Sequence, residues 1–384
     1  MRTVMKNTLC SLLFLGILAG LLALLSVLFR PKENTKEAGF QDPRANGILS
    51  EPEDSIDVVI LGDSETYSTF IPLQIWQDYG FTSYVCGTPS QKLCYTEEFL
   101  EKTFIRQNPR IVFLETDAIF QIFTQSEIIA GEAENLLPVF RYHDRWKTLR
   151  LSDWSFQVDY STKENNKGYL FSTLVRPSDR KDHMKKTNAR EEIPSKSIRA
   201  VEDISAFCRK NNTRLVLIST PSTINWNYKR HNSIAALAES LDLEYIDMNL
   251  MNQQIGIDWS TDTRDRGSHL NVYGAVKATA FLGEYLADTG LFRDKRTDDA
   301  YAGWDAALEE FNRSTGGILS DKGAANQTQY GREQICPGHT CSFLRDRPRA
   351  APHKARLRAL HSICRTSSVR CCPASSCEKC PFAV

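Results

Sequence analysis

The sequence has no net charge, because 47 lysine and arginine residues balance 47 aspartate and glutamate residues. A balanced chain has no global attraction to nucleic acid or to anionic lipid, and we expect no nucleic-acid partner. A glycine-rich loop with a following lysine is also missing, and Asp63 and Glu65 beside Ser64 would repel phosphate, so a phosphate-binding domain is disfavoured. The hydrophobic fraction of 41% and the aromatic fraction of 10% do support a packed core.

Cysteine is sparse until the end of the chain, where a Cys- and Arg-rich tail over residues 313–384 holds seven of the eleven cysteines. This tail has few acids and no apolar periodicity. Cys377-x-x-Cys380 could form half of a metal knuckle, but no second pair has ligand-like spacing, and a disulfide-bonded appendage is another alternative. We interpret the tail as disordered, or as an artefact such as a frameshift, and expect no metal or other cofactor. The seven are Cys336, Cys341, Cys364, Cys371, Cys372, Cys377 and Cys380.

Charge is absent from one long apolar stretch, Leu9 to Phe29, which as a helix would span about 30 Å and cross a bilayer. It is longer than a signal-peptide core and has no small-x-small cleavage site after it, which favours an uncleaved anchor. Basic residues flank it on both sides, so their count leaves the orientation open. We expect a short cytoplasmic tail and single-pass membrane anchor over residues 1–30, a polar linker over 31–54 and an extracytoplasmic domain beyond, held at the cell membrane.

Residues 55–312 show short apolar runs that alternate with helical periodicity, and a polar residue follows each run. This pattern is typical of an α/β fold with a doubly wound parallel sheet. Between about 118 and 195 the periodicity weakens, which we interpret as an insertion over the sheet, a lid or an acceptor-binding cap. Its basic run, 181–190, could equally be a solvated loop. The expected strands are 58–61, 82–86, 111–114, 215–218 and 243–247; the expected helices are 65–70, 71–79, 93–106, 198–211, 231–241 and 274–286.

Ser64 lies just beyond the first of these runs, Val58 to Leu61, after a turn that Gly62 permits. The carboxyl edge of an open α/β sheet is where ligands bind, so Ser64 suits a nucleophile. The alternative is that Ser64 only caps the following helix. A nucleophilic serine needs a base, and His269 is the histidine placed to supply it, in a polar loop between the last strand and the closing helix.

The sequence resembles the SGNH, or GDSL-like, hydrolase superfamily over about residues 56–291. The resemblance rests on Gly62-Asp63-Ser64 after the first strand, Gly87 after the second, and His269-Leu270-Asn271 near the end. The anchor and the segment Tyr142-His143-Asp144-Arg145-Trp146 are similar to the extracytoplasmic branch that includes the teichoic-acid D-alanylation protein and alginate-type O-acetyltransferases. The resemblance implies a flavodoxin-like SGNH hydrolase domain with Ser64 as nucleophile, His269 as general base and an aspartate that orients the base.

The aspartate departs from the family pattern. In the family it stands three residues before the histidine, and here that position is Arg266. Asp265, one residue further back, is our assignment, because a bulge at Gly267 could restore its contact with His269. Asp262 is the alternative acid.

The oxyanion hole departs from the pattern as well. The family's asparagine after the third strand is replaced by Glu115-Thr116-Asp117, and a carboxylate there would repel a developing oxyanion. We therefore expect the donors to be the backbone amides of Ser64 and Gly87, with Thr116 assisting. Losing one such donor typically slows catalysis by about a hundredfold to a thousandfold.

These inferences lead to a serine esterase or O-acyltransferase that acts on an ester or acyl-carrying substrate such as a cell-envelope glycan. Trp154, Trp226 and Tyr228 could stack on a sugar if they line the cleft, whereas their alternative role is ordinary packing. The alternative function is a catalytically weak scaffold of the same fold that binds a membrane acyltransferase or a carrier protein.

Overall fold

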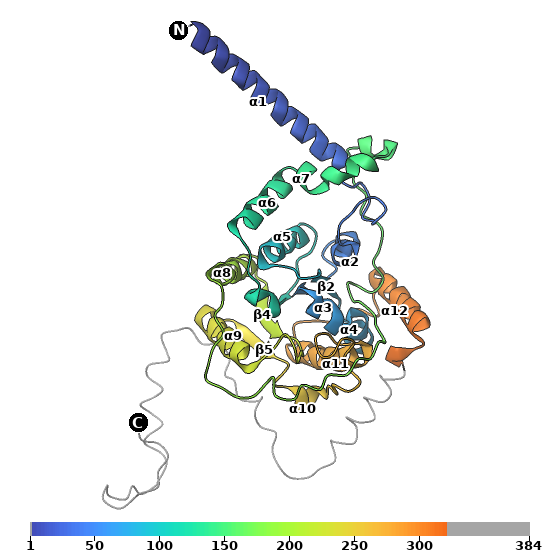
Figure 1. The fold of residues 1–384 in the computed structure, drawn as a ribbon. Helices are drawn as coiled ribbons and strands as arrows, with labels where there is room; N and C mark the ends of the chain where they lie inside the picture. Colours follow the sequence, from blue (N-terminus) through green and yellow to red (C-terminus); the bar gives the residue numbers. More distant parts are fainter. Residues whose placement is uncertain (1, 321–384) are drawn as a thin grey trace, which may run out of the picture. The chain divides into compact units, whose positions relative to one another are not determined.

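The computed structural model describes residues 2–320 (Figure 1). The interpretation of the cysteines Cys336 to Cys380 therefore lies outside the described residues. The first residues assigned to the tail, by contrast, belong to the folded domain. Helix α12, Ala302–Thr315, packs against the core through Trp304 and Phe311, and Leu319 beyond it is 2% exposed.

Five parallel strands form one sheet in the order β2-β1-β3-β4-β5. This order confirms the predicted α/β fold with a doubly wound, flavodoxin-like sheet. The chain reverses direction across the sheet between β1 and β3, and the carboxyl ends of these two strands border the crevice where such folds bind ligands. The strands are β1 (Val58–Gly62), β2 (Ser83–Gly87), β3 (Ile111–Glu115), β4 (Arg214–Ser219) and β5 (Glu244–Asp247).

The central strands are apolar throughout because helices cover both faces of the sheet. Alternate side chains of β1 enter different cores: Val59 and Leu61 join one cluster, whereas Val58 and Ile60 join the other. Helices α5 and α8 cover the first face, and α11 covers the second (Figure 1). The helices around the sheet are α3 (Ser64–Thr69), α4 (Pro72–Tyr79), α5 (Leu93–Phe104), α8 (Ser195–Lys210), α9 (Tyr228–Leu241), α10 (Asn252–Ile255) and α11 (Val272–Asp288).

Helix α1, Arg2–Phe29, is long and apolar enough over Thr3–Phe29 to be a membrane span or a signal sequence. Its last turn is hydrogen-bonded to the domain. Lys32 Nζ donates to the carbonyl of Val27 at 2.6 Å, and Arg145 Nη1 donates to the carbonyl of Phe29 at 2.6 Å. Two of the carbonyls that a helix end leaves without partners are thereby satisfied.

Residues 31–54 are not the extended linker that their polar composition suggested. They contain α2 (Pro43–Asn46) and the 3-10 helix η1 (Gly47–Ser50), and the side chains of Phe40 and Ile48 are buried in the core. Glu51 forms a buried ion pair of 2.7 Å with Lys167. A few apolar residues and one buried ion pair thus fix this segment to the domain, which composition alone does not reveal.

The insertion after β3 has two parts. The first consists of short helices on the side of α1, and the capping box of Thr124 and Glu127 begins the longest of them. The second part is irregular, and we call its residues 169–180 the strap. The helices are η2 (Asp117–Phe120), α6 (Gln125–Leu136), α7 (Val139–Tyr142), η3 (His143–Lys147) and η4 (Leu151–Trp154).

Candidate active site

Ser64 is the first residue of α3 and lies two residues after Gly62, the carboxyl end of β1. The cap of this helix is Asp63, whose carboxylate accepts a hydrogen bond of 3.0 Å from the amide of Glu65. The alternative that Ser64 is merely the helix cap is therefore wrong. Its hydroxyl is left for another partner, and its side chain is only partly buried at the edge of the sheet.

That partner is His269. The hydroxyl of Ser64 lies 2.8 Å from His269 Nε2, and His269 Nδ1 lies 2.5 Å from Asp265 Oδ2. The second oxygen of Asp265 accepts a hydrogen bond of 2.7 Å from the backbone amide of His269. A carboxylate at Nδ1 fixes the imidazole tautomer with its proton there, so that Nε2 is free to accept the serine proton.

The loop that carries the histidine explains how Asp265 reaches it from four residues away. Arg266 and Gly267 both have positive φ values, 67° and 95°. A Cβ atom added at Gly267 would lie 1.9 Å from Thr223 Oγ1, so glycine is required at this position. The turn folds the loop back on itself, and the hydroxyl of Thr263 closes it by donating to the carbonyl of His269 at 2.9 Å.

Asp262, the alternative acid, has other partners. It is 1% exposed, its carboxylate pairs with Lys277 at 2.6 Å, and it accepts the amide of Asp258 at 2.8 Å. Its side chain therefore anchors the start of the loop to α11. Of the two aspartates, the structure brings only Asp265 to His269.

Burial would raise the pKa of Asp265, but the hydrogen bonds from the side chain and the amide of His269 outweigh it, and the pKa lies below its ordinary value. The charge of Arg264 acts in the same direction, as does that of His269 when its ring is protonated. The Asp265 carboxylate is therefore ionised at neutral pH, and its negative charge stabilises the imidazole of His269 when the ring takes up a second proton.

The strap joins the two halves of the site. Its Leu170 amide donates to the carbonyl of Tyr67 on α3 at 2.8 Å, and its Arg176 amide donates to the carbonyl of Thr263 at 2.9 Å. In return, the amide of Arg266 donates to the carbonyl of Arg176 at 2.9 Å. The sequence suggested a lid over the sheet; this part of the insertion is instead hydrogen-bonded beside the histidine loop and supports it.

Four acids lie close to one another beside Ser64: Asp63, Glu65, Glu115 and Asp117. Glu65 and Glu115 are each 1% exposed. Burial raises the pKa of both well above its ordinary value, and the charges of the neighbouring acids raise it further. Both shifts favour the neutral carboxyl, so Glu115 opposes an oxyanion less strongly than the sequence suggested. Within residues 2–320, no group of three or more His, Cys, Asp or Glu side chains could hold a metal ion.

Asp117 is the acid of this cluster that has a cationic partner. Arg230 Nη1 donates to it at 2.6 Å, while Arg230 Nε pairs with Glu191 at 2.8 Å. Burial and the charge of Asp63 raise the pKa of Asp117 to about 7, although Arg230 and His269 lower it. This carboxyl therefore changes its charge close to neutral pH.

Thr116 is not placed to assist an oxyanion. Its amide donates to the carbonyl of Ile218 at 3.1 Å, and its fully buried hydroxyl shares a hydrogen bond of 2.6 Å with Ser219. Gly87, by contrast, lies close to the turn at residues 62–65, which carries Ser64: a Cβ atom added there would lie 2.7 Å from the carbonyl oxygen of Asp63. Of the three expected donors, Ser64 and Gly87 border the site.

Sequence reasoning missed Asn225. Its Nδ2 donates to Glu65 at 2.5 Å and to the hydroxyl of Ser268 at 3.0 Å, which are the neighbours of Ser64 and His269 in the chain. Asn225 therefore connects the turn that carries Ser64 with the loop that carries His269. The polar run after β4 was the available signal, because the carboxyl ends of parallel strands share one edge of the sheet.

The aromatic residues considered for sugar stacking do not form a platform. Trp226 is 2% exposed and donates to Asp247 at 3.1 Å, and the ring of Tyr228 packs against His231. Trp154 is exposed, but it lies on η4, in the part of the insertion that contacts α1. Packing therefore explains the first two, and the third belongs to another surface.

No protein-family model matches the sequence, and comparison with curated proteins finds no match either. Solved structures similar to this chain include a GDSL-like lipase from Bacteroides thetaiotaomicron, with 10% identity, a TM-score of 0.31 and coverage of 60% of this chain and 88% of that one. A lipase/acylhydrolase from Enterococcus faecalis has 11% identity, a TM-score of 0.34 and coverage of 61% of this chain and 96% of that one. The acetyl xylan esterase AlAXEase has 14% identity, a TM-score of 0.32 and coverage of 61% of this chain and 99% of that one. The chemistry assigned to this chain rests on its own side-chain geometry.

Proposed function

We propose that this chain is a serine esterase or O-acyltransferase, held at the cell membrane by α1, that acts on an ester of the cell envelope. One observation carries the proposal: the continuous hydrogen-bonded series from Ser64 through His269 to Asp265, with separations of 2.8 Å and 2.5 Å. A nucleophile bonded to a base that is itself oriented by an acid is the arrangement that acyl transfer requires.

In the proposed mechanism His269 Nε2 accepts the proton of Ser64 as the serine oxygen attacks the ester carbonyl. Asp265 stabilises the imidazolium that results. The same proton is then delivered to the leaving alkoxide, and an acyl-serine remains. Water or a carbohydrate hydroxyl, deprotonated by His269, resolves the acyl-serine and regenerates the hydroxyl.

The backbone supplies the oxyanion donors in this proposal. The amide of Ser64 is at the first position of α3, where helix geometry offers it no acceptor. The amide of Gly87 is the second donor, on the neighbouring strand. Because burial raises the pKa of Glu65 and of Glu115, it favours their neutral forms and reduces the repulsion of the negative charge that develops on the carbonyl oxygen.

Retention of α1 as an anchor is supported by the way its last turn is used. Ser26 accepts the amide of Val139 at 3.3 Å, and Leu28 is 9% exposed. Removal of α1 as a signal sequence would take these contacts away and leave Lys32 and Arg145 without the carbonyls of Val27 and Phe29. A domain attached in this way reaches substrates at the membrane surface, hence the assignment to an envelope ester.

The test is labelling of the purified full chain with a fluorophosphonate probe, which reacts with an activated serine. We expect labelling of the wild type and none of Ser64→Ala or His269→Ala. The matched controls are Ser126→Ala and His143→Ala, both at exposed positions away from the site, and these should label as the wild type does. A folded wild type that resists the probe would instead support the scaffold function.

A further inference from the structure

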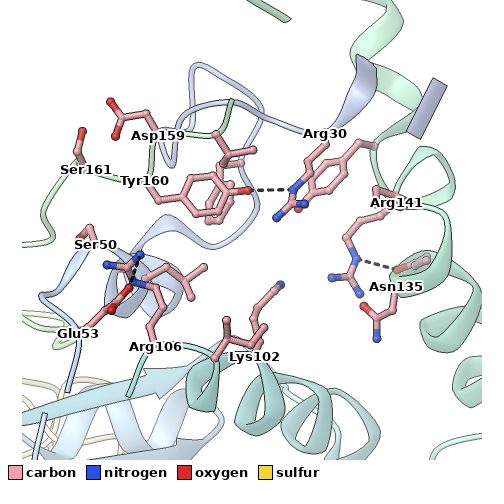
Figure 2. Close-up of a pocket in the computed structure, with 17 residues that line it drawn as sticks. Arg30, Ser50, Glu53, Lys102, Arg106, Asn135, Arg141, Asp159, Tyr160 and Ser161 are labelled. Atoms are coloured by element: carbon pink, nitrogen blue, oxygen red, sulfur yellow. Dashed lines mark hydrogen bonds and ion pairs between the residues drawn. The ribbon is translucent and has the colours of Figure 1, made fainter. Parts of the chain in front are cut away.

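A cavity of about 700 Å³ lies on the side of the domain where α1 ends, between α5, α6, α7, η1 and residues 158–161 (Figure 2). The residues Ser64, His269 and Asp265 are not among those that line it. Its wall holds four basic side chains, which are Arg30, Lys102, Arg106 and Arg141.

Two of these cations are neutralised and two are not. Arg141 makes a bidentate pair with Glu98, at 2.8 Å and 3.0 Å, and Arg106 lies 3.6 Å from Glu53. The side chain of Arg30 donates to the hydroxyl of Tyr160 at 3.4 Å, and the ammonium of Lys102 has no hydrogen bond or ion pair to a residue within 2–320. The side chains of Lys102 and Arg30 both point into the hollow in Figure 2.

The ammonium of Lys102 therefore sits in an environment that disfavours its charge. Burial lowers its pKa, and the positive charges of Arg141 and Arg30 lower it further, against the opposite effect of Glu98. A half-buried cation beside two like charges is stabilised by an anion that enters the same space. Three carboxylates also line the cavity, but Glu53 and Glu134 pair with Arg106 and Arg141, and that of Asp159 points away from Lys102 and Arg30 in Figure 2. The cavity thus has room for an anionic group beside the two unpaired cations.

The position of the cavity indicates where such an anion would come from. Arg30 directly follows Phe29, the last residue of the candidate membrane span. If α1 crosses the bilayer, Arg30 and the cavity lie at the level of the lipid headgroups.

Exposed apolar side chains mark the same end of the domain. Arg145 on η3 bonds to Asp153 on η4 at 2.7 Å and to the carbonyl of Phe29, so both elements are held at the end of α1. Trp146 and Trp154 on these elements are 62% and 64% exposed, and Leu151 is 92% exposed. Exposed tryptophans beside a membrane span are typical of the interface between lipid and water.

We propose that this cavity binds the phosphate group of an anionic membrane lipid, with Lys102 and Arg30 contacting the phosphate oxygens. The apolar residues of the lining, Ile105 and Val158 among them, would contact the glycerol and the first acyl carbons. The proposal rests on α1 being a membrane span and is independent of catalysis at Ser64.

The test uses the full chain in a neutral detergent and measures the dissociation constant of phosphatidylglycerol by native mass spectrometry. We expect binding that weakens at least about thirtyfold in the double variant Lys102→Gln, Arg30→Gln, consistent with the loss of two charge-assisted contacts. Lys102→Arg keeps the charge and should bind within about threefold of wild type. The matched control is Lys36→Gln, which removes a lysine that is exposed and close to the span in sequence but outside the cavity lining.

Two further ligands test whether the cavity prefers a lipid to free phosphate and an anionic lipid to a zwitterionic one. Inorganic phosphate and phosphatidylcholine should each bind at least about tenfold more weakly than phosphatidylglycerol. Equal binding of phosphatidylglycerol by the double variant and the wild type would overturn the proposal, as would equal affinity for inorganic phosphate, which would indicate a soluble ligand. Circular dichroism of the double variant checks its fold, and if it is unfolded, the single variant Lys102→Gln takes its place. Failure of the fluorophosphonate test leaves these outcomes unchanged.

Discussion

Asp265 holds His269 at two points, with one carboxylate oxygen 2.5 Å from the ring Nδ1 and the other 2.7 Å from the backbone amide. The aspartate thus fixes both the ring and the chain that carries it. The acid reaches the histidine from four residues before it, because the positive φ values of Arg266 and Gly267 fold the loop back on itself.

The first prediction separates the two aspartates of this loop. Asp265→Asn should lower kcat for a chromogenic acetyl ester by about a hundredfold to ten-thousandfold, since an amide no longer enforces the productive tautomer or stabilises the imidazolium. Asp262→Asn should leave kcat within about threefold of wild type. This variant should instead unfold at a lower urea concentration, since the ammonium of Lys277 loses the negative charge of the Asp262 carboxylate, which lies 2.6 Å away. If Asp262→Asn lost the larger share of kcat, the assignment of the acid would be wrong.

The second prediction concerns Asn225, which bonds to Glu65 and Ser268. Asn225→Ala should lower kcat by about tenfold to a hundredfold with little change in KM, because small displacements of reacting groups are costly in rate. The matched control is Asn232→Ala, which also removes two amide hydrogen bonds, to the carbonyls of Thr187 and Ala189. A comparable loss of kcat in both variants would indicate general destabilisation rather than positioning.

The third prediction uses two glycines. At Gly87 a Cβ atom would lie 2.2 Å from Thr66 Oγ1 and 2.7 Å from the carbonyl oxygen of Asp63. Gly87→Ala should therefore displace the turn before Ser64 and abolish fluorophosphonate labelling. At Gly131, inside α6, the nearest atom would be 3.8 Å away. Gly131→Ala should retain full labelling and raise stability by about 0.5 to 1 kcal/mol, since alanine favours a helix more than glycine does.

The fourth prediction concerns the pH dependence of stability. Folding raises the pKa of Asp117 to about 7 from 3.8, so the folded chain holds this proton more tightly than the unfolded chain. Its contribution to stability is complete below pH 3.8 and is lost as the pH rises towards 7. The free energy of unfolding should fall between pH 5 and pH 8 by up to about 2.5 kcal/mol from this group.

Urea denaturation of the full chain, followed by tryptophan fluorescence at several pH values, measures this dependence. Asp117→Asn should flatten it near pH 7, whereas Asp144→Asn, at a position 78% exposed, should reproduce the wild-type curve. An identical slope in Asp117→Asn and the wild type would show that Asp117 does not titrate in this range.

The sheet was predictable from sequence because its strands are buried on both faces. Such a strand has to be apolar at every position, and Val58 to Leu61, Ile111 to Leu114 and Leu215 to Ile218 are short runs of this kind. The nucleophile and the base could be proposed for a related reason: each stands in a polar stretch directly after a strand or before a helix. Strand order then brings them to one edge.

Other features depend on contacts between distant segments and leave little trace in the sequence. Residues 31–54 looked like a linker because their polar residues outnumber the few, such as Phe40 and Ile48, that reach the core. The helices after β3 were missed because several of their apolar residues, including Ile129 and Leu136, are exposed, which removes the amphipathic periodicity. Asn225 has a role only because the loops after β1, β4 and β5 meet.

The contacts of the strap bear on the order in which the parts of the site assemble during synthesis. Ser64 and His269 are separated by 205 positions in the chain. The strap lies between them and is hydrogen-bonded to a later segment, since the carbonyl of Ser172 accepts the amide of Val272 at 2.8 Å. During synthesis from the N-terminus, the serine and the strap are made long before the loop that completes them. Until that loop has emerged, the serine has no base and an ordinary, weakly nucleophilic hydroxyl. The nascent chain therefore lacks the series from Ser64 through His269 to Asp265 until nearly all of the folded domain has been made.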